Sequence, residues 1–274
     1  MMTEPYVAWD LKSVNCLNVA LEPGWVLHRR AYGDGSFIVD CFGLHLGRFS
    51  AVIRGAGRKS RGGSAVGQAQ PFTPLLLKTA GRGDLKTLHQ LETTAAAVKL
   101  EGKALFKGLY INELLIRTLP RYDPHPRLFA VYGDLLPKLI GDDEQPLREF
   151  ELTLLEELGY ELIFAHDAEG DYIDPQCDYG YQPSVGFIRK MFQDRQQAGP
   201  VDTHVLKVSG EALLAIATWR HGDYVLSDSE SQCLKRIIRL ALAQQLGERP
   251  LKSRELFRAF MRDNAQLEGA NSRQ

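Results

Sequence analysis

Five short β-type runs between residues 24 and 92 constrain the fold of this chain more than any other feature. The runs GWVLHRRAY, SFIVDCFG, GRFSAVIRG, FTPLLLKT and LKTLHQLE are separated by glycine-bearing turns such as YGDGS and AGRGD. In the third run, Phe49, Ala51 and Ile53 fall on one side of the predicted strand. Five strands in so short a stretch predict a small closed or partly closed β-barrel.

Beyond Thr93 the hydrophobic residues recur with helical spacing. Residues 105–116, 147–158 and 234–242 each fit a period of about 3.6 residues. Gly159 follows one of these segments as a helix stop, and Asp228 or Ser229 is expected to cap another. The predicted fold class is therefore α+β, with an amino-terminal barrel followed by a mostly α-helical domain.

One segment interrupts the helical pattern. Residues 166–183, HDAEGDYIDPQCDYGYQP, are rich in Gly, Pro, Asp and Tyr, and they predict either a linker or a small loop-rich subdomain. The expected organisation is an amino-terminal extension at 1–21, the barrel at 22–92, a first helical part at 93–165, the irregular insert at 166–183, and a second helical part with the tail at 184–274.

Composition limits the class of protein. With 274 residues and 44% hydrophobic content, the chain can bury a sizeable core. Its longest apolar runs fall well short of the roughly 20 residues of a membrane-spanning helix, and its start has no basic and apolar export signal, so a cytoplasmic location is expected. Its cysteines are scattered without a CxxC pair, which argues against a disulfide framework and a metal site: Cys16, Cys41, Cys177 and Cys233.

Charge is strongly segregated although the formal net charge is only -1. No acidic residue lies between Asp40 and Asp84, an interval that holds seven Lys or Arg residues. From Arg121 to Asp174 the balance reverses, with fourteen acidic residues against four basic ones. Such asymmetry indicates a polyanionic partner for the amino-terminal region.

Residues 54–70, RGAGRKSRGGSAVGQAQ, concentrate this basic character. Arg58 stands where a phosphate-binding loop needs glycine before Lys59, so the segment does not fit that motif. Its glycines let the backbone approach a phosphate strand closely. Aromatic residues of the predicted barrel are candidate stacking surfaces, with core packing as the favoured role of each. The segment predicts sequence-tolerant nucleic-acid binding, with a merely solvated loop as the alternative.

Catalytic motifs are missing from the sequence pattern. Ser36 and Ser64 lack the flanking glycines of a nucleophile elbow, and the histidines form no HExxH or HxH arrangement. The acidic clusters at 142–144 and 156–157 are more simply explained as a solvated loop and a polar helix face. A binding protein is therefore favoured over an enzyme.

Four blocks, QPFTPLLLKTAGRGDLKTL (70–88), GLYINELLIRTL (108–119), LREFELTLLEELGY (147–160) and RPLKSRELFRAFM (249–261), resemble the RecO family of DNA repair and recombination proteins. The resemblance covers about residues 22–261. Residues before it look like an extension. Some members carry a four-cysteine zinc module in the irregular insert, where this chain has only Cys177, so it is similar to the zinc-less branch.

The resemblance implies a non-enzymatic recombination mediator with an amino-terminal OB-fold and no cofactor. Such proteins bind single- and double-stranded DNA and anneal complementary strands. They also bind the carboxy-terminal tail of single-strand binding protein, and with RecR they help RecA load on DNA. A location at the nucleoid follows. Two other classes remain open: an OB-type nucleic-acid-processing enzyme using the carboxylates of 142–144, and an adaptor that binds an acidic protein.

The family's sites are carried over to matching positions of this sequence. The expected DNA-binding residues are Arg29, Arg30, Arg48, Arg54, Arg58, Lys59, Arg61, Lys78, Arg82, Lys86, Lys252 and Arg254. Of these, Lys252 and Arg254 either form a second basic patch or pair with the acidic helical body. For the tail of single-strand binding protein the expected residues are Arg148, Leu152 and Leu155, with core packing as the alternative role of the two leucines.

Overall fold

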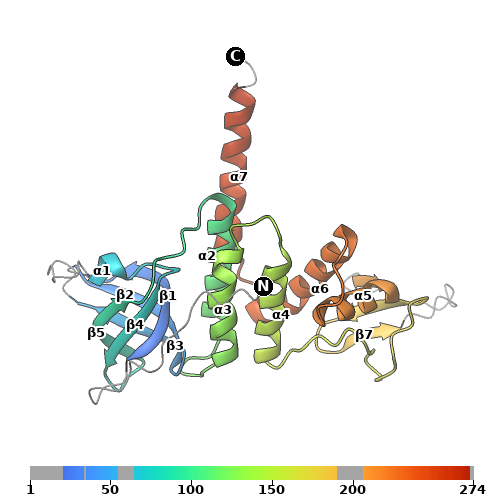
Figure 1. The fold of residues 1–274 in the computed structure, drawn as a ribbon, viewed down its shortest axis with the longest axis horizontal. Coiled ribbons are helices and arrows are strands. Elements are labelled where there is room, and N and C mark those ends of the chain that lie inside the picture. Colours follow the sequence, from blue (N-terminus) through green and yellow to red (C-terminus); the bar gives the residue numbers. More distant parts are fainter. Residues whose placement is uncertain (1–20, 34, 55–64, 190–205, 272–274) are drawn as a thin grey trace, which may run out of the picture. The chain divides into compact units, whose positions relative to one another are not determined.

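A five-stranded barrel forms the amino-terminal part of the computed structural model, which describes residues 21–33, 35–54, 65–189 and 206–271 (Figure 1). Its strands are β1 (Glu22–Ala31), β2 (Phe37–Gly43), β3 (Gly47–Ile53), β4 (Pro74–Ala80) and β5 (Leu85–Thr93). They close in the order β1-β2-β3-β5-β4, and only the β3–β5 pair among them is parallel. The predicted OB-like barrel is confirmed, and each predicted strand lies within two residues of an observed one.

Alternating side chains fill the barrel. Phe49, Ala51 and Ile53 are buried in one cluster with Val39 and Leu77, so the prediction that they share one side of the third strand is confirmed, and that side points into the barrel. A four-residue helix, α1 (Ala65–Gln68), precedes β4. The barrel belongs to the first of two compact units, which spans Met1–Asp143 and Arg249–Gln274, while the second spans Glu144–Glu248.

Helices α2 (Gly102–Thr118), α3 (Pro126–Lys138) and α7 (Lys252–Asn271) complete the first unit. Trp25 and Phe42 of the barrel pack against the rings of α3: the Trp25–Tyr132 centroids lie 5.4 Å apart and the Phe42–Phe129 centroids 5.5 Å apart. All four rings are buried, so this layer is a hydrophobic core shared by strands and helix.

Helix α7 is anchored on α2 by its first turn. The Glu113 carboxylate accepts hydrogen bonds from the backbone N–H groups of Lys252 and Ser253, at 2.9 and 2.8 Å, and from the Ser253 hydroxyl at 2.7 Å. Farther along α7, the rings of Phe257 and Phe260 lie against Phe106. Glu113 thus supplies from another helix the cap that the start of α7 requires.

The second unit contains α4 (Gln145–Glu157), α5 (Gly210–Arg220), α6 (Asp228–Leu246) and a three-stranded sheet in the order β7-β6-β8. Gly159 adopts φ +81° after α4, and the N–H of Tyr160 bonds to the Leu155 carbonyl, as a glycine-terminated helix requires. The predicted stop is confirmed. The predicted cap of α6 at Asp228 or Ser229 is wrong, because Ser227 and Glu230 cap each other's backbone reciprocally.

The sheet of the second unit corrects the expectation of irregular structure throughout residues 166–183. Strand β6 (Asp178–Gln182) pairs antiparallel with β7 (Gly186–Arg189) and with β8 (Leu206–Ser209). Tyr179 and Tyr181 point to one buried face, so the alternation that defines a strand is present within a Gly- and Asp-rich sequence. Among the described residues, no helix is long and apolar enough to cross a membrane.

We expect Glu113→Gln to loosen α7 without disturbing the barrel. Burial alone would raise the pKa of Glu113, but the hydrogen bonds from Ser253 and Lys252 and the charge of Arg117 outweigh it, so the pKa is lowered. The carboxylate therefore stabilises the native state fully above its unfolded pKa of about 4.3 and loses this effect as the pH falls through the lower folded value. Hydrogen exchange of α7 at pH 3 to 7 measures this, and equal protection in both proteins at pH 7 would contradict it.

Candidate nucleic-acid interface

Among the expected DNA-binding residues of the barrel, Arg30 and Arg54 point outward. Arg30 pairs in register with Ile38, and the same row continues through Val52 of β3 to Thr87 of β5. This row is the outer face, because the neighbouring row, which contains Val39 and Ala51, points into the core. Arg30 and Arg54 are exposed, and Arg54 follows β3 directly. They provide outward-facing cations near the end of β1 and directly after β3, the two strands that flank β2.

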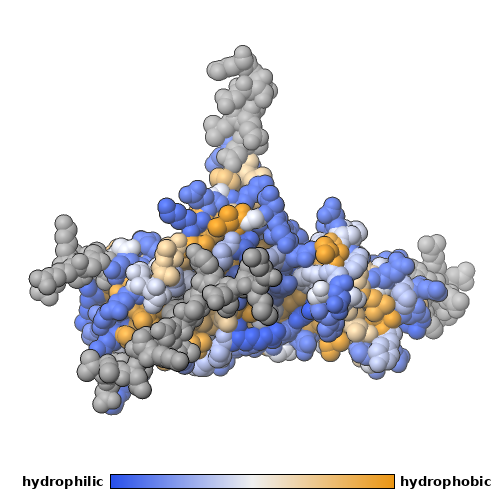
Figure 2. Space-filling view, in the orientation of Figure 1, coloured by the Kyte–Doolittle hydropathy of each residue, from blue (hydrophilic) through white to orange (hydrophobic). Residues whose placement is uncertain are grey.

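The remaining barrel candidates differ in exposure. Arg29 is half-buried, with its guanidinium carbon 5.4 Å from the centre of the Phe37 ring. Lys78 is half-buried on β4, whereas Arg82 is exposed in the turn between β4 and β5. Lys86 on β5 is half-buried, and its ammonium donates to the Gly81 carbonyl at 3.2 Å. Figure 2 shows that the visible surface over the strands is mainly hydrophilic with small apolar patches.

Three expected residues, Arg58, Lys59 and Arg61, lie outside the described residues. Their segment is bounded by Arg54 on one side and by α1 on the other. The structure therefore gives the position from which the basic segment leaves β3, next to the outer face that carries Arg30.

Arg48 has a different environment from the other barrel candidates. Its Nε–H donates to the Leu119 carbonyl at 2.8 Å, and its own carbonyl accepts from the Tyr122 N–H at 2.9 Å. Burial, followed by the nearby charge of Arg121, lowers the pKa of Arg48. These contacts bind β3 to the connection between α2 and α3, so Arg48 has a structural role in addition to its charge.

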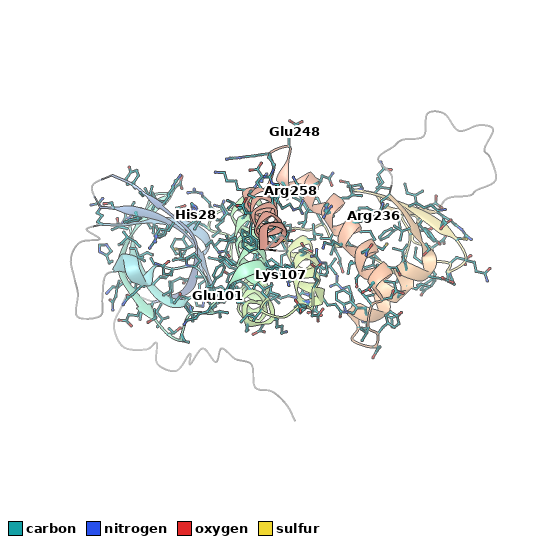
Figure 3. The ribbon with its side chains drawn as sticks, turned by 90° about the horizontal axis from the view of Figure 1, so that it is seen from above. His28, Glu101, Lys107, Arg236, Glu248 and Arg258 are labelled. Atoms are coloured by element: carbon teal, nitrogen blue, oxygen red, sulfur yellow. The ribbon has the colours of Figure 1, made fainter. Side chains whose placement is uncertain are left out.

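Lys252 and Arg254 lie at the start of α7, where they hold this helix against α2. Arg254 places its guanidinium 5.5 Å above the ring of Tyr110, and the backbone of Lys252 is bound by Glu113. Figure 3 shows Arg258 on α7 and Lys107 on α2, away from His28 on the barrel. The α7 residues therefore belong to a separate basic region of the first unit.

Arg148, Leu152 and Leu155 lie on α4 and are all buried. The Arg148 guanidinium forms ion pairs with Glu151, which is 1% exposed, and with Glu144 at 3.5 Å. Glu144 is half-exposed and also pairs with Lys235 of α6 at 2.8 Å. Leu152 and Leu155 are 1% and 0% exposed, which is the burial of core residues.

Sequence reasoning missed a polar group on the outer face of the barrel. Asp40 accepts a hydrogen bond from the Ser50 hydroxyl at 2.6 Å, and His28 lies 3.9 Å away from it. Asp40 thus places one carboxylate on the outer face, two residues from the strand position that pairs with Arg30, and the exposed His28 lies opposite it. The three residues are ten or more positions apart, and only the strand register reveals that they meet.

The acidic cluster proposed as a catalytic alternative is open to solvent. Asp142 and Asp143 are exposed, while Glu144 is engaged by Arg148 and Lys235. Within the described part of the chain, no group of three or more His, Cys, Asp or Glu side chains converges to hold a metal ion. Cys177, the single cysteine of the insert, contacts Asp174 and Arg189.

Comparison with known proteins agrees with this architecture. Residues 19–97 match the family model "Recombination protein O N terminal", and residues 100–255 match "Recombination protein O C terminal". The chain belongs to the RecO family. The two matched regions meet after β5, so the barrel and the helical region correspond to the two halves of a RecO protein.

Curated relatives named "DNA repair protein RecO" match over most of the chain. The protein of Alkalilimnicola ehrlichii is 41% identical over 89% of this chain and 93% of its own length. Those of Aliivibrio salmonicida and Halorhodospira halophila are 38% and 40% identical, over 86% and 87% of this chain and 94% and 97% of their own lengths. The RecO resemblance of the sequence blocks is thereby confirmed.

We expect Arg148→Ala to lower the free energy of unfolding by about 3 kcal/mol, because it removes the guanidinium that pairs with the buried Glu151 carboxylate. The double variant Arg148→Met with Glu151→Leu should recover most of this loss, since neither charge then remains buried. Urea denaturation of both variants measures the effect. Equal stability of the single variant and the unmodified protein would contradict the buried ion pair.

Proposed function

We propose that this RecO-family chain binds single- and double-stranded DNA on the outer face of its barrel and anneals complementary strands. A role in DNA repair and recombination follows from membership of the family. The observation that supports the finer proposal is the exposure of Arg30, Arg54 and Arg82 on a closed OB-like barrel in which residues 41–83 include no acidic residue. Barrels of this type bind single strands through strand faces and loops.

The proposed mechanism requires no bond chemistry. Cations that contact phosphates release the counterions condensed on DNA, and this release supplies affinity for any sequence. A surface that neutralises two strands lowers their mutual repulsion, so complementary strands meet without ATP. We therefore propose a non-enzymatic mediator that works at the nucleoid in the cytoplasm.

Partner binding is the second part of the proposal. Family membership supports association with RecR and, through it, assistance to RecA loading on DNA coated with single-strand binding protein. For the acidic tail of single-strand binding protein we propose the Arg148 end of α4. There the tail replaces Glu144, which is the more exposed partner of Arg148 and also holds Lys235. While the tail is bound, the ion pair with Glu151 holds the Arg148 side chain in place.

Charge reversal of the basic segment tests the DNA surface. We expect the variant with Arg54, Arg58, Lys59 and Arg61 all changed to Glu to bind a labelled oligonucleotide more weakly. The slope of log affinity against log salt should fall by about 0.7 for each lost contact with a single strand. A control variant with Arg236 and Arg239 of α6 changed to Glu should bind as before. Unchanged affinity at several salt concentrations would overturn the DNA surface.

The function as a whole is tested by annealing. Complementary strands coated with single-strand binding protein should pair faster in the presence of this chain and without ATP. Shortened labelled strands in magnesium would instead favour the enzymatic alternative at residues 142–144. Absence of any salt-dependent oligonucleotide binding would favour the adaptor that meets an acidic protein.

Glu144→Gln tests the tail site. Removing this carboxylate takes one acidic neighbour away from Arg148 and Lys235, so we expect an acidic tail peptide to bind several-fold more tightly, while naked DNA binds as before. Glu149→Gln is the matched control, because Glu149 is an exposed acid of the same helix. Calorimetry with the peptide measures both variants. Equal affinities for Glu144→Gln and Glu149→Gln would contradict the replacement of Glu144 by the tail.

A further inference from the structure

The turn between β4 and β5 is held by a side chain from outside the barrel. The hydroxyl of Tyr122, in the connection between α2 and α3, donates to the Asp84 carbonyl at 2.7 Å and lies 3.4 Å from the Gly83 carbonyl. Asp84 and Gly83 are 38 and 39 positions from Tyr122 in the sequence. A strand-connecting turn is usually free to move, and here its backbone carbonyls have a fixed donor.

Lys86 completes the attachment of the turn. Its ammonium lies 4.9 Å above the centre of the Tyr122 ring, and it also donates to the Gly81 carbonyl. The turn is thus bonded at its first residue by Lys86 and at its last two by Tyr122, while Arg82 between them is exposed. The contacts fix the backbone on both sides of Arg82 and leave its side chain open to a ligand.

The backbone of Tyr122 is itself constrained. Its φ of +59° is in the left-handed region, which is unfavourable for a bulky residue. Its N–H bonds to the Arg48 carbonyl, and the Arg48 guanidinium bonds to Leu119. Gly47 allows this close approach, because a Cβ there would collide with the Asp123 backbone. Conformations of this kind persist where the surroundings enforce them, and they concentrate at functional sites.

Burial and the neighbouring Asp84 raise the pKa of the Tyr122 hydroxyl, although Arg121 opposes them. The hydroxyl therefore remains a hydrogen-bond donor at neutral pH. This matches the two carbonyl oxygens that it faces, since both can only accept.

We propose that Tyr122 is a positioning residue for DNA binding: it fixes the β4–β5 turn so that Arg82 meets a DNA phosphate in a preformed geometry. The inference rests on the proposed DNA surface of the barrel. Preforming the turn removes the ordering cost that a mobile loop would pay when it binds. Arg48 and Lys86 then contribute mainly by supporting the backbone and the ring of Tyr122.

Tyr122→Phe is the test, because it removes the hydroxyl and keeps the ring beneath Lys86. In the full chain without DNA we expect faster trypsin cleavage after Arg82. Affinity for an oligonucleotide should fall several-fold. The slope of log affinity against log salt concentration should become shallower by up to about 0.7, which is the contribution of one phosphate contact with a single strand. Tyr224→Phe is the control, since it removes a tyrosine hydroxyl that bonds to Glu230 in the second unit, and it should change neither cleavage nor slope.

A double variant separates positioning from general destabilisation. Arg82→Gln should weaken binding by a similar factor, and adding Tyr122→Phe to it should cause no further loss. Additive losses, or unchanged cleavage in Tyr122→Phe, would overturn the positioning role and leave DNA binding by the barrel intact. A third outcome is that Tyr122→Phe is cleaved faster but Arg82→Gln binds DNA with full affinity. This would show that the turn does not contact DNA, and it would overturn the inference.

Discussion

The hydrogen bond from Asn112 to the Leu27 carbonyl is the contact on which the first unit depends. Strand β1 has a register shift between Val26 and His28, so Leu27 stands outside the ladder that joins β1 to β2. The Asn112 amide donates to the Leu27 carbonyl at 2.8 Å, and Tyr132 donates to the other end of the same side chain at 2.8 Å. All of this is buried, where an unsatisfied carbonyl would cost about 1–3 kcal/mol.

This polar chain explains why the barrel and its helices form one core. It joins β1 to α2 and α3 at the layer where Trp25 and Phe42 pack on the rings of α3. Hydrophobic contact alone would allow the helices to slide on the strands, whereas a buried amide with two partners permits one register. The outer face carrying Arg30 is therefore oriented by a residue that has no contact with it.

Local patterns in the sequence predicted the barrel strands and helices α2, α4 and α6, because strand alternation and helical spacing are short-range properties. Strand β6 was missed, since Asp, Gly and Tyr in its short run resemble a turn until Tyr179 and Tyr181 are seen to share a face. The cap of α6 was misplaced by one or two residues, because Ser227, Asp228 and Ser229 are all acceptable caps and only Glu230 selects among them.

The candidate site was less predictable than the fold, because the fate of a cation depends on distant residues. Arg30 and Arg48 fall in the first and third strands of the same predicted barrel, yet Arg30 is exposed and Arg48 is bonded to Leu119 from the end of α2. Arg148, which was expected at a site for an acidic ligand, is already paired with Glu151 of its own helix. The sequence shows where the charged residues lie along the chain, but their exposure to solvent depends on tertiary contacts.

The return of α7 to the first unit gives the chain an unusual covalent layout. Because Arg249 onward packs with α2, the second unit begins and ends on the same body, as an insertion does. A domain attached at two points cannot drift away on a linker, and cutting one connection leaves the other intact. A ligand bound by one unit is consequently kept at a high effective concentration near the other for as long as either connection survives.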